Sequence, residues 1–209
     1  MKYIIFDFDG TIADSMPLVI DIARSLLPEV DLSDKRVQNL RNLSPRDIVR
    51  AAKLPYIKIP RLLVKGKRQL AKRLDEIPIV HGMDTTIADL HRAGYTLLVV
   101  SSNSEVNIRL FLDKYSIKQY FKAIYGNVGL FSKAQTLRKV VHWQRIKSAD
   151  VLYVGDEVRD IEAAKRTDIR SAAVTWGFNG RHILKKYEPT FLVEKPAQLI
   201  QLIKERHDE

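Results

Sequence analysis

The hydrophobic residues of the chain follow two periodicities, which divide it into two regions. Short continuous apolar runs, typical of strands buried on both faces of a parallel sheet, occur within residues 1–15 and again after residue 82. Stretches with apolar residues at helical spacing separate these runs. The alternation predicts a three-layer α/β fold with a mostly parallel sheet. The expected strands are residues 3–6, 96–100, 123–125, 151–154, 172–174 and 191–193.

Three helices can be placed between or after these strands. The first begins near Asp84, which is the expected N-cap, and ends at Gly94. The second runs from about Lys133 to Val141. The last opens with Pro196 in its first turn, and its expected buried residues are Leu199, Ile200, Leu202 and Ile203.

Residues 16–81 contain no convincing strand pattern. Their apolar residues have helical spacing, and Ser44 followed by Pro45 indicates a further helix start. We therefore expect a small helical domain, residues 16–81, inserted after the first strand into an α/β core of residues 1–15 and 82–209. The residues with helical spacing are Leu18, Val19, Ile22 and Leu26, and then Leu62, Leu63, Leu70 and Leu74.

Composition narrows the class of protein. The chain has 209 residues, 45% of them hydrophobic, which is enough for a substantial core. It has no cysteine, so disulfides and thiolate metal sites are excluded, and a cytoplasmic location is expected. No apolar run approaches the roughly 18 residues of a membrane span, so no membrane partner is expected.

Positive charge is concentrated in the insert. The net charge is +10, and residues 35–73 hold 13 Lys and Arg but a single acid, Asp47. Two interpretations remain open with similar weight: a site for an anionic ligand, or long cationic side chains that coat a solvated helix face.

Charged and polar residues from four separate segments of the chain are expected at one edge of the sheet. Asp7 and Asp9 follow the first strand, Ser101 follows the second, and Asp156 follows the fourth. Lys133 opens a helix between strands. Ligands of open α/β sheets bind beyond the carboxyl ends of the strands, so these residues are candidates for one site. Unpaired buried carboxylates are costly, and a metal cation is their usual partner.

The order of these motifs resembles the haloacid dehalogenase-like hydrolase superfamily. The matching features are D-x-D-G-T at 7–11, Ser101, Lys133 and G-D-x-x-x-D at 155–160. The segments "DFDGTIADS", "VGDEVRDIEAAKRTDI" and "VTWGFNG" are most similar to the phosphoglycolate phosphatase-like branch. The resemblance implies a Rossmann-like core, with the helical insert in the position of a mobile cap.

The resemblance also implies a role for each motif residue. Asp7 would be the nucleophile that forms an aspartyl-phosphate, and Asp9 the general acid and base. Mg²⁺ would be held by Asp7, the backbone carbonyl of Asp9 and Asp156, with support from Asp160. The expected phosphate-binding residues are Gly10, Thr11, Ser101, Ser102, Asn103 and Lys133, of which Ser101 and Lys133 also count as catalytic.

Each motif has a simpler structural interpretation when taken alone. Asp9 and Gly10 form a common turn pair, and Asp156 and Asp160 could be acids that the helix dipole favours. Ser104 is expected to cap the following helix. Thr11 and Asp14 are expected to shape a loop rather than to catalyse. Glu157 departs from the branch's pattern by placing another carboxyl group beside the metal, where it either points to solvent or alters the metal site.

Three functions follow from these features. The first is a Mg²⁺-dependent phosphatase for a small phosphorylated metabolite, as a monomer or homodimer. The second is a sugar phosphomutase, which needs the same Asp7 and Asp9. The third is a module in which the basic insert binds nucleic acid or another polyanion. Residues 35–73 contain one aromatic residue, Tyr56, so platforms for base stacking are lacking and nucleic acid is not the expected partner. Closure of the insert predicts hinges near residues 14–17 and 80–83.

Overall fold

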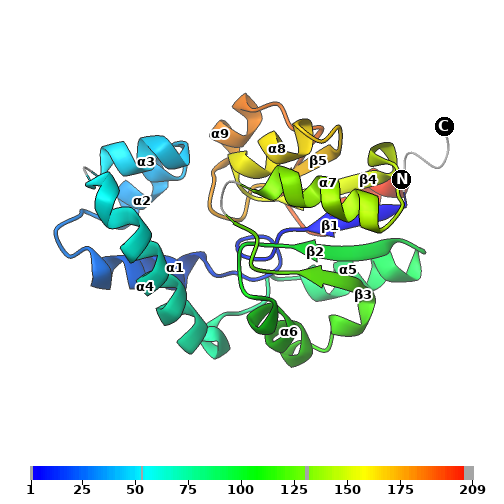
Figure 1. Ribbon diagram of the computed structural model, residues 1–209, viewed down its shortest axis with the longest axis horizontal. Coiled ribbons are helices and arrows are strands. Elements are labelled where there is room, and N and C mark those ends of the chain that lie inside the picture. Colours follow the sequence, from blue (N-terminus) through cyan, green and yellow to red (C-terminus); the bar gives the residue numbers. More distant parts are fainter. Residues whose placement is uncertain (1, 53, 130–131, 205–209) are drawn as a thin grey trace.

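The core is a six-stranded parallel sheet between two layers of helices (Figure 1). The structure is a computed structural model that describes residues 2–52, 54–129 and 132–204. The strand order is β3-β2-β1-β4-β5-β6, and each pairing is parallel. All six expected strands are present, which confirms the α/β, Rossmann-like fold. Their bounds are β1 (Tyr3–Phe6), β2 (Thr96–Val100), β3 (Phe121–Tyr125), β4 (Val151–Gly155), β5 (Arg170–Val174) and β6 (Phe191–Val193).

Both faces of the sheet are buried, which explains the continuous apolar runs. Along β1, Ile4 and Phe6 face one hydrophobic cluster and Ile5 faces the other. The first cluster includes side chains of α5 (Met83–Arg92), α6 (Glu105–Lys114) and α10 (Gln198–Lys204). The second includes side chains of α7 (Lys133–Trp143) and α8 (Val158–Lys165). A smaller cluster joins α8 and β5 to α9 (Arg181–Lys186).

Two helix starts differ from the sequence prediction. Helix α5 begins at Met83 after an N-cap at Gly82, whose φ of 79° makes the left-handed turn, so Asp84 lies in the first turn and is not the cap. Helix α10 begins at Gln198, because the Pro196 carbonyl accepts a hydrogen bond from Leu199 N in a separate turn before it. Leu199 is buried as expected. Ile200 and Leu202 are partly buried, and the Ile203 side chain lies outside the described residues.

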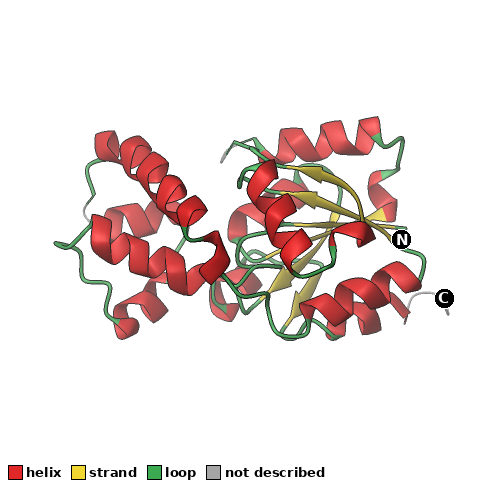
Figure 2. Cartoon of the chain, turned by 90° about the horizontal axis from the view of Figure 1, so that it is seen from below, coloured by secondary structure: helices red, strands yellow, loops and turns green. Residues whose placement is uncertain are grey.

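The insert consists of helices, as expected, and lies beyond the carboxyl ends of the strands (Figures 1 and 2). Within it, α1 packs against α4. The Ser44 hydroxyl accepts a hydrogen bond from Asp47 N at 3.3 Å, which confirms that Ser44 starts a helix. Among the described residues of the insert, the α-helices are α1 (Met16–Leu26), α2 (Asp34–Leu40), α3 (Pro45–Ala51) and α4 (Ile59–Lys72). Short 3₁₀ helices occur at Tyr56–Lys58, Leu74–Glu76, Lys118–Tyr120 and Ser148–Asp150.

The chain enters and leaves the insert along one double connection. Asp14 N donates to the Pro78 carbonyl, and Val80 N donates to the Ile12 carbonyl, both at 2.9 Å. The two connecting segments therefore run side by side, next to the loop that follows β1. The predicted hinges flank this connection and stay a prediction.

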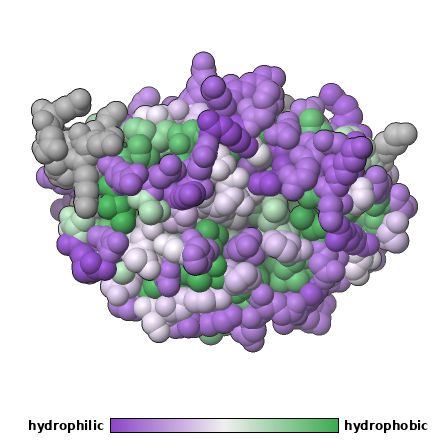
Figure 3. Space-filling model, turned by 180° about the vertical axis from the view of Figure 1, so that it is seen from behind, coloured by the Kyte–Doolittle hydropathy of each residue, from purple (hydrophilic) through white to green (hydrophobic). Residues whose placement is uncertain are grey.

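Hydrophilic side chains cover most of the face shown in Figure 3, with separate smaller hydrophobic areas between them. Among the described residues, no helix combines the length and the apolar character that crossing a membrane requires.

Candidate active site

The candidate site lies at the topological switch point of the sheet, where the chain stops adding strands on one side of β1 and begins to add them on the other. Strand β1 is central and pairs with β2 on one side and β4 on the other. Loops that leave the carboxyl ends of β1, β2 and β4 therefore meet here, as ligand-binding loops do in doubly wound sheets. The motif residues after these three strands come from segments far apart in the sequence.

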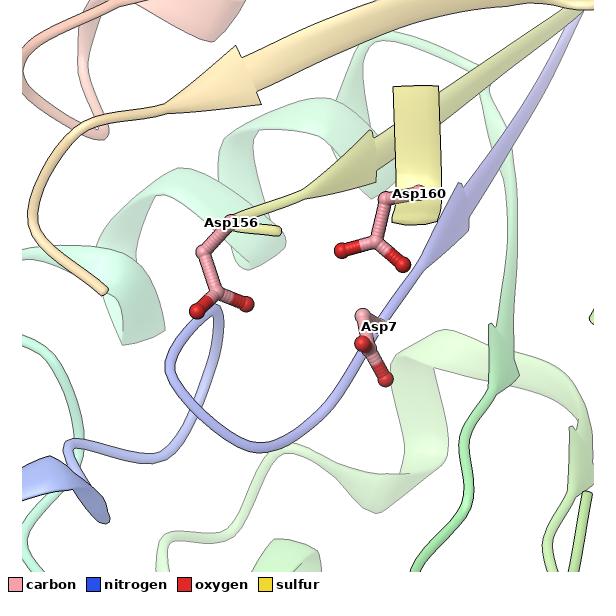
Figure 4. A group of neighbouring side chains, drawn as sticks. All are labelled: Asp7, Asp156 and Asp160. Carbon is pink, nitrogen blue, oxygen red and sulfur yellow. The ribbon is translucent and has the colours of Figure 1, made fainter. Parts of the chain in front are cut away.

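Three carboxylates converge at this point (Figure 4). Asp7 follows β1, Asp156 follows β4, and Asp160 lies in the first turn of α8. One oxygen of each lies within 4.8 Å of the others, and all three residues are buried. The structure thus brings together three of the four acids expected around a metal ion.

Lys133 is buried against two of these carboxylates. Its Nζ donates to Asp7 Oδ2 at 2.6 Å and to Asp160 Oδ1. Burial alone would lower the pKa of the amine, but Asp160 and Asp7 hold it well above its usual value. The Tyr153 ring, whose centroid is 5.5 Å from Nζ, closes the other side. The first turn of a helix disfavours a cation, and here two buried anions offset that effect.

Asp156 is held from two directions. Its Oδ1 accepts a hydrogen bond from Thr11 Oγ1 at 2.9 Å, and its Oδ2 accepts one from Phe178 N at 2.7 Å. Burial raises the pKa of Asp156 well above its usual value, and the neighbouring Glu157, Asp160 and Asp7 raise it further. The Thr11 hydroxyl thus joins the loop after β1 to Asp156.

Two glycines allow the surrounding loops to approach Asp156 closely. A Cβ on Gly10, whose φ is 72°, would lie 2.2 Å from Asp156 Oδ2. A Cβ on Gly177 would lie 2.3 Å from the same oxygen. Both loops therefore need glycine at the point where they surround this carboxylate.

Asp9 lies beside the three carboxylates but points to a different partner. Its Oδ2 accepts a hydrogen bond from Asn103 Nδ2 at 3.0 Å. Its Oδ1 is buried and has no hydrogen-bond partner among the residues that the structure describes. Burial, reinforced by the charge of Asp7, raises the pKa of Asp9 to about 6. A carboxyl group with this pKa can both donate and accept a proton near neutral pH.

The segment after β2 is a short loop that leads into helix α6 (Glu105–Lys114). Ser101 is buried, and its hydroxyl accepts a hydrogen bond from Asn103 N at 3.3 Å. Helix α6 begins only at Glu105, so Ser102 and Asn103 belong to the preceding loop and not to the helix start. Ser104 caps α6 by accepting a hydrogen bond from Asn107 N at 3.1 Å, as predicted. Asn103 orients the Asp9 carboxyl group, a role that the sequence did not indicate.

The sequence left open whether the Glu157 side chain points to solvent or alters the metal site. In the structure, Glu157 forms an ion pair with Arg159. Its side chain is only 18% exposed, so it does not point freely to solvent. Burial raises the pKa of Glu157, while Arg159 opposes that effect. The backbone N–H of Glu157 donates to Asp160 Oδ2 at 2.9 Å, which helps to fix that carboxylate at the start of α8.

A further group of site residues follows β5. The sequence motifs did not assign these residues a place in the site. In this segment, Phe178 N binds Asp156, and Trp176 Nε1 donates to the Thr11 carbonyl at 3.1 Å. Asn179 is buried, and its Oδ1 accepts a hydrogen bond from Val158 N, at the start of α8. The signal was present, because two glycines and an Asn follow the carboxyl end of a strand at the same edge of the sheet.

The charge balance of the site suits a divalent cation. Five carboxyl groups, those of Asp7, Asp9, Asp156, Glu157 and Asp160, gather around the cations Lys133 and Arg159. Carboxylate oxygens are the ligands that Mg²⁺ and Ca²⁺ prefer. The three converging oxygens, and the loops that only glycine permits around Asp156, therefore fit a metal ion of this class.

Comparison with known proteins agrees with this geometry. The family profile of the haloacid dehalogenase-like hydrolases matches residues 4–174. The phosphoglycolate phosphatase of Synechococcus elongatus is 37% identical over 206 residues, with 97% of each chain covered. The chain belongs to the haloacid dehalogenase-like hydrolase family.

Solved structures show the same fold. A predicted phosphatase from Clostridium acetobutylicum superposes with a TM-score of 0.81 at 23% identity and covers 98% of each chain. A haloacid dehalogenase-like hydrolase from Streptococcus pneumoniae superposes with a TM-score of 0.80 at 20% identity, over 97% of this chain and 98% of that one. The similarity extends over the insert as well as the sheet, because nearly the whole chain is covered.

Proposed function

We propose that the chain is a Mg²⁺-dependent phosphatase that hydrolyses a small phosphorylated metabolite, with phosphoglycolate as the first candidate. The observation that carries the proposal is the grouping of Asp7, Asp156 and Asp160 around one point, with Asp9 beside them. A phosphoryl transfer site needs a positioned nucleophile, cationic groups for the phosphoryl oxygens and a proton donor for the leaving group. The site offers candidates for each.

Asp7, Asp156, Asp160 and the backbone carbonyl of Asp9 are the groups that would hold Mg²⁺. When bound, the ion offsets the charge of the phosphoryl oxygens, so that a dianionic phosphate can approach a carboxylate. Lys133 supplies a second positive charge directly beside Asp7.

The Asp7 carboxylate attacks phosphorus in the first step. The bond from phosphorus to the leaving oxygen breaks, and that oxygen takes the proton of Asp9. In the second step, the Asp9 carboxylate takes a proton from water, the water oxygen attacks phosphorus, and inorganic phosphate and free Asp7 result. The pKa of Asp9, raised to about 6 mainly by burial, supports both roles.

The phosphate itself would be bound by groups around this point. Lys133 and the Ser101 hydroxyl are side-chain candidates, and the backbone N–H of Ser102 is a further one. The backbone N–H groups of Gly10 and Thr11, two of the residues expected to bind phosphate, already donate to the Ala13 carbonyl at 2.8 Å and the Phe8 carbonyl at 3.2 Å. The Asn103 side chain already binds Asp9, which leaves it the task of orienting the proton donor.

The choice of phosphoglycolate rests on the Synechococcus relative, whose identity is 37% over nearly the whole chain. This relative also favours hydrolysis over the sugar phosphomutase alternative. We propose the insert as the cap that selects the substrate, because it lies beyond the rim that holds the site (Figure 1). The polyanion-binding alternative, the cytoplasmic location and the oligomeric state stay predictions.

Replacement of Asp7 by Asn tests the proposal. Asp7→Asn keeps the size of the side chain but removes the nucleophile, so hydrolysis of p-nitrophenyl phosphate and phosphoglycolate with Mg²⁺ should fall by at least about a thousandfold. Asp84→Asn, an exposed acid on α5, is the matched control and should keep full activity. Inorganic phosphate release is the measurement, and circular dichroism checks that both variants fold. Substantial activity of a folded Asp7→Asn variant would refute the proposal.

A further inference from the structure

Arg41 connects the insert to the segment that surrounds Asp156. It follows the last residue of α2, and its guanidinium group donates to three backbone carbonyls after β5. The distances are 2.9 Å to Gly177 O, 3.2 Å to Thr175 O and 3.4 Å to Phe178 O. One side chain of the insert thus binds three carbonyls within residues 175–178, which are 134–137 positions away in the sequence.

Residues of the core also donate hydrogen bonds to the insert. Gly180 N donates to the Arg41 carbonyl at 2.8 Å. Asn179 Nδ2 donates to the same carbonyl at 3.2 Å and to the Leu43 carbonyl at 3.3 Å. Asn179 is only 4% exposed, so these hydrogen bonds are buried parts of the junction and not surface contacts.

The same segment positions the cation site. Phe178 N binds Asp156 Oδ2 at 2.7 Å, and Asn179 N donates to the Asp156 carbonyl at 3.2 Å. The Asn179 side chain also accepts from Val158 N at 2.9 Å, at the start of the helix that carries Asp160. A shift of residues 175–180 would therefore move the donors of one candidate metal ligand and the helix start of another.

We propose that Arg41 is a positioning residue through which docking of the insert and binding of the cation stabilise each other. Docked Arg41 holds residues 175–180 in the conformation that keeps Asp156 in place. In return, a cation bound to Asp156 holds residues 175–180 in the same conformation, which keeps their carbonyls in position to accept hydrogen bonds from Arg41. The coupling is reciprocal, because both events favour one conformation of the same segment. The proposal rests on the cation site of the proposed function.

The affinity for Mg²⁺ alone provides the first test. Titration calorimetry without substrate should show that Arg41→Ala weakens Mg²⁺ binding about fivefold or more, the lower end of typical coupling between sites. Arg41→Lys, which can reach one carbonyl but not three, should lie between Arg41→Ala and the wild type. The control is Arg36→Ala. It removes the same charge from α2, but Arg36 binds the Ala51 carbonyl within the insert, so Mg²⁺ affinity should stay within about twofold of the wild type.

The position of the insert provides a second readout that needs no turnover. The chain has no cysteine, so spin labels can be attached specifically at Lys35→Cys on α2 and Lys139→Cys on α7, both exposed. Electron–electron distance measurements should show that Mg²⁺ narrows the distribution of label distances in the wild-type background. In the Arg41→Ala background, the distribution should be broad and insensitive to Mg²⁺.

Three results would overturn the proposal. The first is an unchanged Mg²⁺ affinity in Arg41→Ala, with or without a lower melting temperature, since that would give Arg41 a purely structural role. The second is equal weakening by Arg36→Ala, which would indicate a general charge effect. The third is a wild-type protein that does not bind Mg²⁺. If instead Mg²⁺ binds and the coupling is found, but Asp7→Asn retains activity, the proposed function fails and the role of Arg41 stands.

Discussion

The buried acidic residues of the site lower the stability of the folded protein. Burial raises the pKa values of Asp9, Asp156, Glu157 and Asp160, which means that their ionised forms are disfavoured in the folded protein. Lys133 and Arg159 offset part of this effect. Such a group of acids is typical of a functional site, where a ligand supplies the missing charge.

The stabilisation by Mg²⁺ should therefore increase with pH. In the metal-free protein, burial raises the pKa values of Asp156 and Asp160, two of the carboxylates that would hold Mg²⁺, whereas in the unfolded chain the pKa of an Asp is near 4. Between these values the folded state holds more protons, so its stability falls as the pH rises. Mg²⁺ binds the ionised carboxylates and reverses that loss.

Thermal unfolding with saturating Mg²⁺ and with a chelator measures this effect. The increase in melting temperature caused by Mg²⁺ should be small near pH 5 and at least about 2–4 °C larger near pH 7.5, which corresponds to roughly 1 kcal/mol for a chain of this size. Asp156→Asn, which removes one expected ligand, should abolish the increase. An increase of the same size at both pH values would contradict this account of the carboxyl groups.

At the scale of elements, two loops are packed against one carboxylate. The loops after β1 and β5 approach Asp156 so closely that a Cβ on Gly10 or Gly177 would overlap its oxygen. With Asp156 as the proposed cation ligand, we expect loop packing and cation binding to be linked. A small change in the backbone of either loop should therefore lower the affinity for Mg²⁺ more clearly than it lowers the stability of the fold.

Gly10→Ala tests this packing, and Gly82→Ala is its matched control. Both glycines have positive φ values, 72° and 79°, so alanine costs about 1 kcal/mol of strain at each. A Cβ on Gly82 meets no atom within 4 Å, whereas one on Gly10 meets Asp156 Oδ2 at 2.2 Å. We expect similar losses of stability from the strain, but a loss of Mg²⁺ affinity, measured by calorimetry, of at least about tenfold in Gly10→Ala alone. Equal Mg²⁺ affinities of the two variants would contradict the close packing.

The sheet and the group of acids were predictable because they depend on local patterns. Continuous apolar runs located every strand, and the order of the strand ends brought Asp7 and Asp156 to the same edge. The start of α5 was misjudged, since an acid such as Asp84 can occupy either the cap or the first turn. The turn at Gly82 decided between the two.

Contacts between side chains far apart in sequence were not predictable. Arg41 binds carbonyls of residues 175–178, and no pattern in either segment indicates the other. The same holds for Asn103, whose residue type fits phosphate binding as well as the contact with Asp9 that the structure shows. Residue type limits the possible chemistry, whereas the fold selects the partner.

At the scale of the whole molecule, the insert faces the rim where the acids meet (Figures 1 and 2). It contacts the core on two sides, through Arg41 and through Lys67, whose Nζ donates to the Ser102 carbonyl at 3.0 Å. Other basic residues of α4, such as Lys65 and Arg68, are exposed. This arrangement agrees with either interpretation of the basic insert, and it brings positive charge to the side of the insert that contacts the rim.

The most direct test of the central claim is a search for phosphate bound to Asp7 itself. Excess enzyme is mixed with ³²P-labelled phosphoglycolate, quenched with acid within the first turnover, and digested. The account predicts label on the peptide that carries Asp7 when Mg²⁺ is present, and none there when Mg²⁺ is chelated or when Asp7 is replaced by Asn. Turnover with label on another residue, or label on Asp7 that does not depend on Mg²⁺, would contradict it.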